Sequence, residues 1–382
     1  MMRLREIWQR AHRCFAIDSW RRALCHALLV LAALGVGALL FVVAGFAPIA
    51  ADKGHWPITR AFLQVAMSRS VSTHTLGLRA PPLDDPVLIA KGAGHYANGC
   101  MPCHGAPGVE RPPLVRRMLP EPPPLARTLG NLPPEHLFWI VKHGLKYTAM
   151  PAWIAPDRDD EVWAMAAFLQ RLPKLTPAQF RALAYGDAHT GDIAAQCTRC
   201  HGREGREGEG FPRLAGQSAD YLLASLQAFA DGKRHSGIMQ PVAAALDPQQ
   251  RQALVEHFAA MTPTVSDIPP ATDMAAIARG RALAAHGDGR RRIPACAACH
   301  GPGDDARNPM FPSVAGQHAD YLALQLRLFS INGRGGTWYA PLMERAAAAL
   351  NARDIRDLAL YYASLPPERD IDAASGGRRK GM

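Results

Sequence analysis

Six of the eight cysteines in the 382-residue sequence form three pairs, and a histidine directly follows each pair. The three motifs are Cys100-Met-Pro-Cys103-His104, Cys197-Thr-Arg-Cys200-His201 and Cys296-Ala-Ala-Cys299-His300. Their first cysteines lie 97 and 99 residues apart, so each interval has the length of one small domain. A motif that returns at such an interval indicates repeats of one structural unit.

The pattern Cys-X-X-Cys-His is that of covalent haem attachment. Two thiols at this spacing can add to the two vinyl groups of one haem, and the adjacent imidazole then reaches the iron. The sequence therefore predicts three haem c groups, each with its iron. The predicted attachment residues are Cys100, Cys103, Cys197, Cys200, Cys296 and Cys299, and the predicted proximal iron ligands are His104, His201 and His300.

Two other uses of paired cysteines fit less well. A zinc site needs four ligands, commonly two Cys-X-X-Cys pairs about 15–20 residues apart, whereas these pairs are nearly 100 residues apart. A thiol–disulfide site of the thioredoxin kind needs one pair beside a βαβ pattern, and the sequence contains no such pattern.

The second and third repeats are alike beyond the motif. Residues 211–222 read FPRLAGQSADYL and residues 311–322 read FPSVAGQHADYL. Later segments that begin at Met239 and Met343 both end in Ala-Ala-Ala-Leu. An amphipathic pattern follows each of them and predicts helices over 248–261 and 352–364.

Through these motifs, residues 85–366 resemble class I c-type cytochromes. The second and third repeats resemble tandem cytochromes of the c4 or c5 type. The first repeat is similar to the class I domains of cytochrome subunits of membrane-bound dehydrogenases, through residues 139–144 (WIVKHG) and 148–153 (TAMPAW). It has a proline-rich loop at 112–124 in place of the AGQxADYL segment.

The resemblance implies a methionine ligand on the opposite face of each haem. The candidates are Met150, Met239 and Met343, each expected in a loop before the last helix of its unit. A thioether favours ferrous iron and raises the reduction potential. Met310 competes in the third unit, but it lies only ten residues past His300.

The resemblance also implies that a proline carbonyl accepts the other ring N–H of each proximal histidine. Pro212 and Pro312 are the expected acceptors in the second and third units, and Pro124 is the expected acceptor in the first. In the first unit, a helix over 86–99 is expected to pack on the last helix, over 159–171, through Gly94 and Tyr96.

The expected fold is all-α, with three tandem class I cytochrome c domains after one N-terminal transmembrane helix, because no alternating run is long enough to suggest a sheet. The expected boundaries are 1–22 for a basic cytoplasmic segment, 23–51 for the membrane helix, 52–84 for a linker, 85–173, 177–263 and 273–366 for the three domains, and 367–382 for a disordered tail.

Residues 23–51 form an apolar run that only His26 interrupts. Such a run exceeds the ~20 residues needed to span a bilayer, whereas a cleaved signal peptide has an apolar core of only ~7–15 residues. An uncleaved anchor is favoured, although small residues at 47–51 leave cleavage as an alternative. Arginines dominate the preceding segment, so the positive-inside rule predicts a single-pass protein of the bacterial inner membrane whose haem domains face the periplasm.

These features predict an electron carrier rather than an enzyme, because every haem has two candidate ligands and none is left open for substrate. The expected partners are a membrane-bound dehydrogenase, an oxidase, or a small cytochrome or cupredoxin. The net charge of +10 can steer acidic partners, and no motif suggests nucleic acid. A dehydrogenase subunit feeding the respiratory chain is favoured over the alternatives, a donor subunit of a terminal oxidase and a haem peroxidase.

Overall fold

The computed structural model describes residues 20–47, 49–186, 193–202, 211–263, 273–302 and 308–367. The chain divides into two compact units, Met1–Pro57 and Ile58–Met382. Within the described ranges the regular structure is helical, with only two isolated β-bridges and no strand. The predicted all-α class is therefore confirmed.

The N-terminal unit contains one long apolar helix, α2 (Trp20–Val43). Its segment Arg22–Val43 is long and apolar enough to cross a membrane. The helix ends at a glycine turn, in which the amide of Gly45 bonds the carbonyl of Val42 and the amide of Phe46 bonds that of Phe41. Gly45 has φ +80°, the left-handed backbone typical of this helix end. The helix is thus shorter than the apolar run that predicted it.

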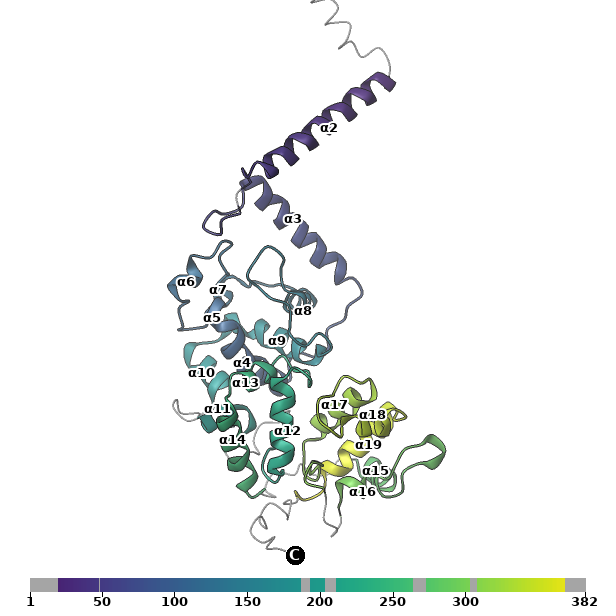
Figure 1. Cartoon of the computed structure of the whole chain (residues 1–382). Helices are drawn as coiled ribbons and strands as arrows, with labels where there is room; N and C mark the ends of the chain where they lie inside the picture. Colours follow the sequence, from purple (N-terminus) through teal and green to yellow (C-terminus); the bar gives the residue numbers. More distant parts are fainter. Residues whose placement is uncertain are drawn as a thin grey trace, which may run out of the picture. The chain divides into compact units, whose positions relative to one another are not determined.

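The second unit begins with the helices of the first haem motif (Figure 1). They are α3 (Pro57–His74), α4 (Pro86–His95), the π-helical turn η1 (Tyr96–Cys100), α5 (Met101–His104), α6 (Pro113–Arg116), α7 (Leu125–Thr128), α8 (Pro134–His143), α9 (Asp159–Arg171), the 3-10 turn η2 (Leu172–Lys174) and α10 (Pro177–Tyr185). The predicted last helix, 159–171, is confirmed by α9. The predicted helix over 86–99 is α-helical only to His95, because a π turn leads into the motif.

The core of this first domain is the contact between α4 and α9. A Cβ placed on Gly92 would lie 2.2 Å from the carbonyl oxygen of Ala164 and 2.6 Å from the Cβ of Phe168. Tyr96 packs on Phe168 with 5.2 Å between ring centroids. The prediction was right about Tyr96 but wrong about Gly94, because Gly92 is the residue that lets the two helices touch.

Helix α10 also belongs to this core, although the sequence assigned residues 177–185 to the second domain. Phe180 is fully buried against Tyr96 and Phe168. Thr176 starts the helix with a capping box, since its hydroxyl accepts the amide of Gln179 and the Gln179 side chain accepts the amide of Thr176. The first domain therefore extends to about residue 185.

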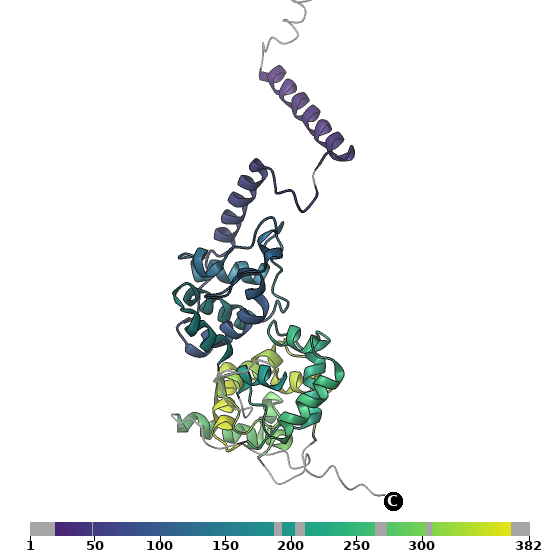
Figure 2. The ribbon, with the colours of Figure 1, turned by 90° about the vertical axis from the view of Figure 1, so that its left-hand side faces the viewer.

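The remaining helices form two similar groups, which lie side by side in both views (Figures 1 and 2). The first group holds α11 (Ile193–His201), α12 (Ala219–Ala230), α13 (Met239–Ala244) and α14 (Pro248–Ala260). The second group holds α15 (Met274–His286), the 3-10 turn η3 (Gly289–Arg291), α16 (Ala297–His300), α17 (Ala319–Ser330), α18 (Ala340–Ala347) and α19 (Ala352–Ala363). Helices α14 and α19 confirm the two predicted terminal helices to within one residue.

The third domain repeats the glycine contact of the first. A Cβ on Gly280 in α15 would lie 2.0 Å from the carbonyl oxygen of Asp357 and 2.8 Å from the Cβ of Tyr361, both in α19. Gly280 thus corresponds to Gly92, and Tyr361 corresponds to Phe168. The same helix pair, joined at a glycine, positions the haem motif in both domains.

Replacing Gly280 by alanine should therefore force α15 and α19 apart. Overpacking of this kind costs about 1–3 kcal/mol, so the free energy of unfolding of the third domain should fall by that amount. Denaturant unfolding of the haem-loaded protein measures it. Gly289→Ala is the matched control, because no heavy atom lies within 4 Å of a Cβ at that position. Equal stability of the two variants would contradict this packing.

Candidate cofactor sites

Each of the three motifs ends a helix at its histidine. Helices α5, α11 and α16 end at His104, His201 and His300, and a glycine with positive φ follows each of them. The chain therefore turns away immediately after the imidazole. Cys100, Cys103, Cys197, Cys200, Cys296 and Cys299 are all partly buried beside these histidines.

A proline carbonyl holds each imidazole. The Nδ1 atoms of His201 and His300 lie 2.9 and 3.0 Å from the carbonyl oxygens of Pro212 and Pro312, as predicted. Because a carbonyl can only accept, Nδ1 carries the proton and Nε2 is left with its lone pair for a metal. Burial lowers the pKa of His201, which favours the neutral imidazole that binds iron.

The first domain uses a different proline from the one predicted. The Nδ1 atom of His104 lies 2.9 Å from the carbonyl oxygen of Pro123, not Pro124. Pro124 is the N-cap of α7, and its carbonyl oxygen accepts the amides of Arg127 and Thr128. The prediction failed because the start of α7 occupies that carbonyl.

The second and third motifs share one cavity of about 830 Å³. His201 and His300 both line it. The equivalent helices α12 and α17 supply matching apolar walls, namely Leu222, Leu226 and Phe229 from α12 and Leu322, Leu326 and Phe329 from α17. An apolar cavity with thiols and imidazoles in its wall suits a flat, largely apolar macrocycle.

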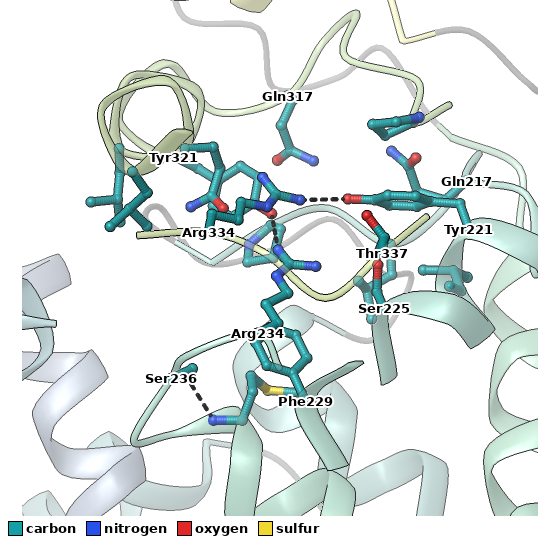
Figure 3. Close-up of a pocket in the computed structure, with 18 of the residues that line it drawn as sticks. Gln217, Tyr221, Ser225, Phe229, Arg234, Ser236, Gln317, Tyr321, Arg334 and Thr337 are labelled. Carbon is teal, nitrogen blue, oxygen red and sulfur yellow. Dashed lines mark hydrogen bonds between the residues drawn. The ribbon is translucent and has the colours of Figure 1, made fainter. Parts of the chain in front are cut away.

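Two buried arginines cross between the second and third domains in this cavity (Figure 3). Arg334 donates to the hydroxyl of Tyr221 at 2.9 Å, and Arg234 donates to the hydroxyl of Tyr321 at 3.3 Å. Their guanidinium groups lie over the rings of Phe329 and Phe229. The exchange is symmetric, since each arginine reaches the tyrosine of the other domain.

These arginines have no carboxylate partner among the residues that the structure describes. Burial and the charge of Arg334 lower the pKa of Arg234. Although burial of Tyr221 acts in the opposite direction, the two arginines lower its pKa to about 8. Two buried cations without an anion are costly, so this cavity fits a ligand that carries carboxylates. The propionates of haem are such groups, and Arg234 and Arg334 would hold them.

A second reciprocal contact joins the same two domains. The side-chain amide of Gln317 bonds both backbone groups of Arg213, at 2.9 and 3.1 Å. Gln217 does the same with Ser313, at 3.1 and 2.7 Å. The glutamine of the repeated AGQ segment thus bridges the two domains. The sequence showed that this residue recurs, but not that its partner lies in the other repeat.

The three predicted axial methionines lie in different local structures. Met150 is in a loop, as predicted, and its carbonyl oxygen accepts the amide of Leu145 at 3.2 Å. Met239 instead begins α13 and Met343 lies within α18, so the expectation of a loop is wrong for these two. Both line the shared cavity, as does Met310. The assignment of the three as iron ligands remains a prediction.

Comparison with known proteins matches the chain to two families in separate ranges. Residues 87–169 match the family of cytochrome c oxidase, cbb3-type, subunit III. Residues 192–262 and 277–366 match the cytochrome c family. These matches cover the helices that carry all three motifs.

Curated relatives align with somewhat less than half of this chain but with most of their own length. A "Thiosulfate dehydrogenase electron acceptor" of Thiomonas intermedia is 35% identical over 175 residues, which are 45% of this chain and 80% of that protein. A cytochrome c4 of Pseudomonas aeruginosa is 35% identical over 185 residues, 48% of this chain and 90% of that protein. A solved cytochrome c4 from Acidithiobacillus ferrooxidans is 35% identical, covers 44% of this chain and 98% of its own, and has a TM-score of 0.39.

Replacing Met343 by alanine tests the least secure of the axial assignments. Loss of its thioether should remove one iron–sulfur charge-transfer band from the ferric spectrum, lower one reduction potential and let carbon monoxide bind one reduced haem. Absorption spectra and a redox titration of the purified protein measure these changes.

Met310→Ala is the matched control, because Met310 lines the same cavity. It should leave the charge-transfer band and the potentials unchanged. Carbon monoxide binding to the Met310→Ala protein, but not to the Met343→Ala protein, would assign the ligand to Met310 instead.

Proposed function

Because this chain belongs to the c-type cytochromes and spans most of the length of cytochromes c4, we propose that it passes electrons through three covalently bound haem c groups. The chain is an electron carrier, as its relatives are. The observation that carries the proposal of three sites is an arrangement that the three motifs share. In each, the histidine ends a helix and a proline carbonyl holds its Nδ1.

When bound, haem c supplies a one-electron couple between ferric and ferrous iron. The residues of the chain do the rest. Pro123, Pro212 and Pro312 fix the imidazoles, and apolar side chains of α12 and α17 exclude water from the shared cavity. A buried cation near a haem favours its reduced state, so Arg234 and Arg334 would raise the potentials of the haems beside them.

The electron donor we propose is a dehydrogenase, with a thiosulfate-oxidising enzyme as the first candidate. The support is the similarity to thiosulfate dehydrogenase electron acceptors of two organisms. The match of residues 87–169 to a subunit of cbb3-type oxidases favours a second role, delivery of electrons to a terminal oxidase. The two roles are compatible, because a carrier needs both a donor and an acceptor.

The site of action that we propose is the periplasmic face of the bacterial inner membrane, with α2 as a single-pass anchor. Helix α2 is apolar over Arg22–Val43 and its apolar side chains are exposed. Six arginines precede residue 23 in the sequence. A membrane span with this flank favours a cytoplasmic N-terminus and haem domains on the other side.

Three covalently bound haems per chain should be detectable as added mass. The intact protein should exceed its polypeptide mass by three haem groups, because thioether bonds survive denaturation, and mass spectrometry under denaturing conditions measures this. Replacing Cys100 and Cys103 together by alanine is the internal check, since it should remove one haem and leave two. A gain of two haems or fewer in the unaltered protein would refute the count.

A thiosulfate dehydrogenase should reduce the purified full-length protein when thiosulfate is present. Absorbance of the reduced haems, followed over time, measures the reaction. Omitting thiosulfate should abolish the reduction, and raising the salt concentration should slow it if the basic surface steers the encounter. If a chemical reductant reduces the protein but this enzyme does not, this donor is excluded. The carrier function would still stand.

A further inference from the structure

A buried carboxylate joins the first domain to the second. Glu161, near the start of α9, is 5% exposed. Its carboxylate accepts the hydroxyl of Ser236 and the amide of Gly237, both at 2.6 Å. The indole N–H of Trp153 donates to the same carboxylate at 3.3 Å. One side chain of the first domain thus holds the loop of residues 234–238, which leads from α12 into α13.

Arg158 completes this junction. Its guanidinium lies 2.9 Å from the Glu161 carboxylate and also donates to the backbone carbonyl oxygen of His235 at 2.9 Å. Asp157 binds the ring of His235. A buried carboxylate that is paired with arginine and accepts further hydrogen bonds has its charge compensated. Removing it would take the acceptor away from the Ser236 hydroxyl, the Gly237 amide and the Trp153 indole N–H. Arg158 would keep its bonds to Asp160 and to the carbonyl oxygen of His235.

Trp153 packs closely against Gly237 at the same junction. A Cβ placed on Gly237 would lie 2.3 Å from the indole ring. No side chain larger than hydrogen fits there without displacing Trp153. The contact is therefore fitted by shape as well as by charge.

The third domain has an acidic residue, Asp354, at the helix position that corresponds to Glu161, and its contacts lie within its own domain. Asp354 stands seven residues before Tyr361, as Glu161 stands seven residues before Phe168. Asp354 pairs with Arg291 of its own domain and accepts the amide of Asn351 at the helix start. Helix-start acids commonly act in this local way. Glu161 instead bonds a neighbouring domain, so its position in the helix does not explain its partners.

The junction lies between two of the proposed haem sites. Trp153 follows Met150 by three residues, and Gly237 precedes Met239 by two. On the other side of the junction, a Cβ on Gly94 would lie 3.3 Å from the Sγ of Cys200. The wall of the shared cavity also includes residues 98 and 99, which directly precede Cys100. The helix that leads into Cys100 therefore lies directly beside Cys200 of the second site.

From this geometry we infer that the first haem exchanges electrons with the second haem across this junction, and that Glu161 is the positioning residue that holds the two in range. The inference rests on the three bound haems proposed above. The step moves one electron, which oxidises the iron of one site and reduces the iron of the other, with no bond made or broken. The second haem would then be the middle of a chain of three, with the third haem beyond the paired arginines.

The test uses the full haem-loaded protein with Glu161→Gln. The amide has the size of the carboxylate, but in either orientation its NH₂ would face N–H donors, those of Gly237 and Trp153 or that of Arg158. The loop should therefore loosen. Hydrogen exchange of the amides in residues 234–239 should become at least tenfold faster. After flash reduction of a small fraction of the haems, the phase of electron redistribution across the junction should slow at least tenfold. The phase between the second and third haems should persist.

Two further variants keep the test decisive. Gly237→Ala, on the second-domain side of the junction, should slow the same phase because the added methyl group displaces Trp153. It alters no charge of the first domain. Asp354→Asn, at the equivalent helix position of the third domain, should leave both the exchange at 234–239 and the junction phase unchanged. Intact mass should show three haems in every variant.

The outcomes separate the two proposals. Fewer than three haems in the unaltered protein would overturn the proposed function. Three haems, with loop exchange and the junction phase unchanged in both Glu161→Gln and Gly237→Ala, would overturn this inference alone. A slowed junction phase in Asp354→Asn equal to that in Glu161→Gln would also overturn it, because the effect would then be general destabilisation.

Discussion

The hydrogen bond between each motif histidine and a proline carbonyl is the constraint on which the three domains depend. It joins residues 11, 12 and 19 positions apart, so each histidine is held by a segment that returns to it from beyond the motif. The first domain uses its long proline-rich segment for this return, and the other two use the shorter segment that begins at Phe211 and Phe311. The rest of each domain then packs around a histidine that is already oriented.

The sequence predicted the features that depend on local chemistry. The motifs and the terminal helices follow from residue types and periodicity, and two of the three proline acceptors follow from the resemblance to class I cytochromes. The errors arose where a second element competes for the same atoms. Pro124 is engaged by the start of α7, and α9 touches Gly92 rather than Gly94. Contacts between repeats, such as those of Gln217 and Glu161, could not be predicted, because a single sequence does not say which surfaces meet.

Charge is distributed unevenly in this molecule, and the pattern follows the interfaces. Between the second and third domains, two arginines are buried without a carboxylate partner among the described residues. Each donates a hydrogen bond to a tyrosine of the other domain. Between the first and second domains, the buried arginine is matched by Glu161. The charges at the interface of the first and second domains are therefore matched within the protein, whereas the propionates of the proposed haems would match those at the interface of the second and third domains. Haem loading should consequently stabilise the interface between the second and third domains more than the interface between the first and second domains.

The reciprocal glutamines have a consequence for the origin of the tandem. Gln217 and Gln317 make the same pair of backbone bonds in opposite directions, which is the pattern of an isologous, two-fold contact. A single ancestral domain with this glutamine could make the same backbone bonds by binding a second copy of itself. Gene duplication and fusion would then have converted a homodimer into one polypeptide. The linker replaces bimolecular association with a high effective concentration, and the two halves become free to diverge.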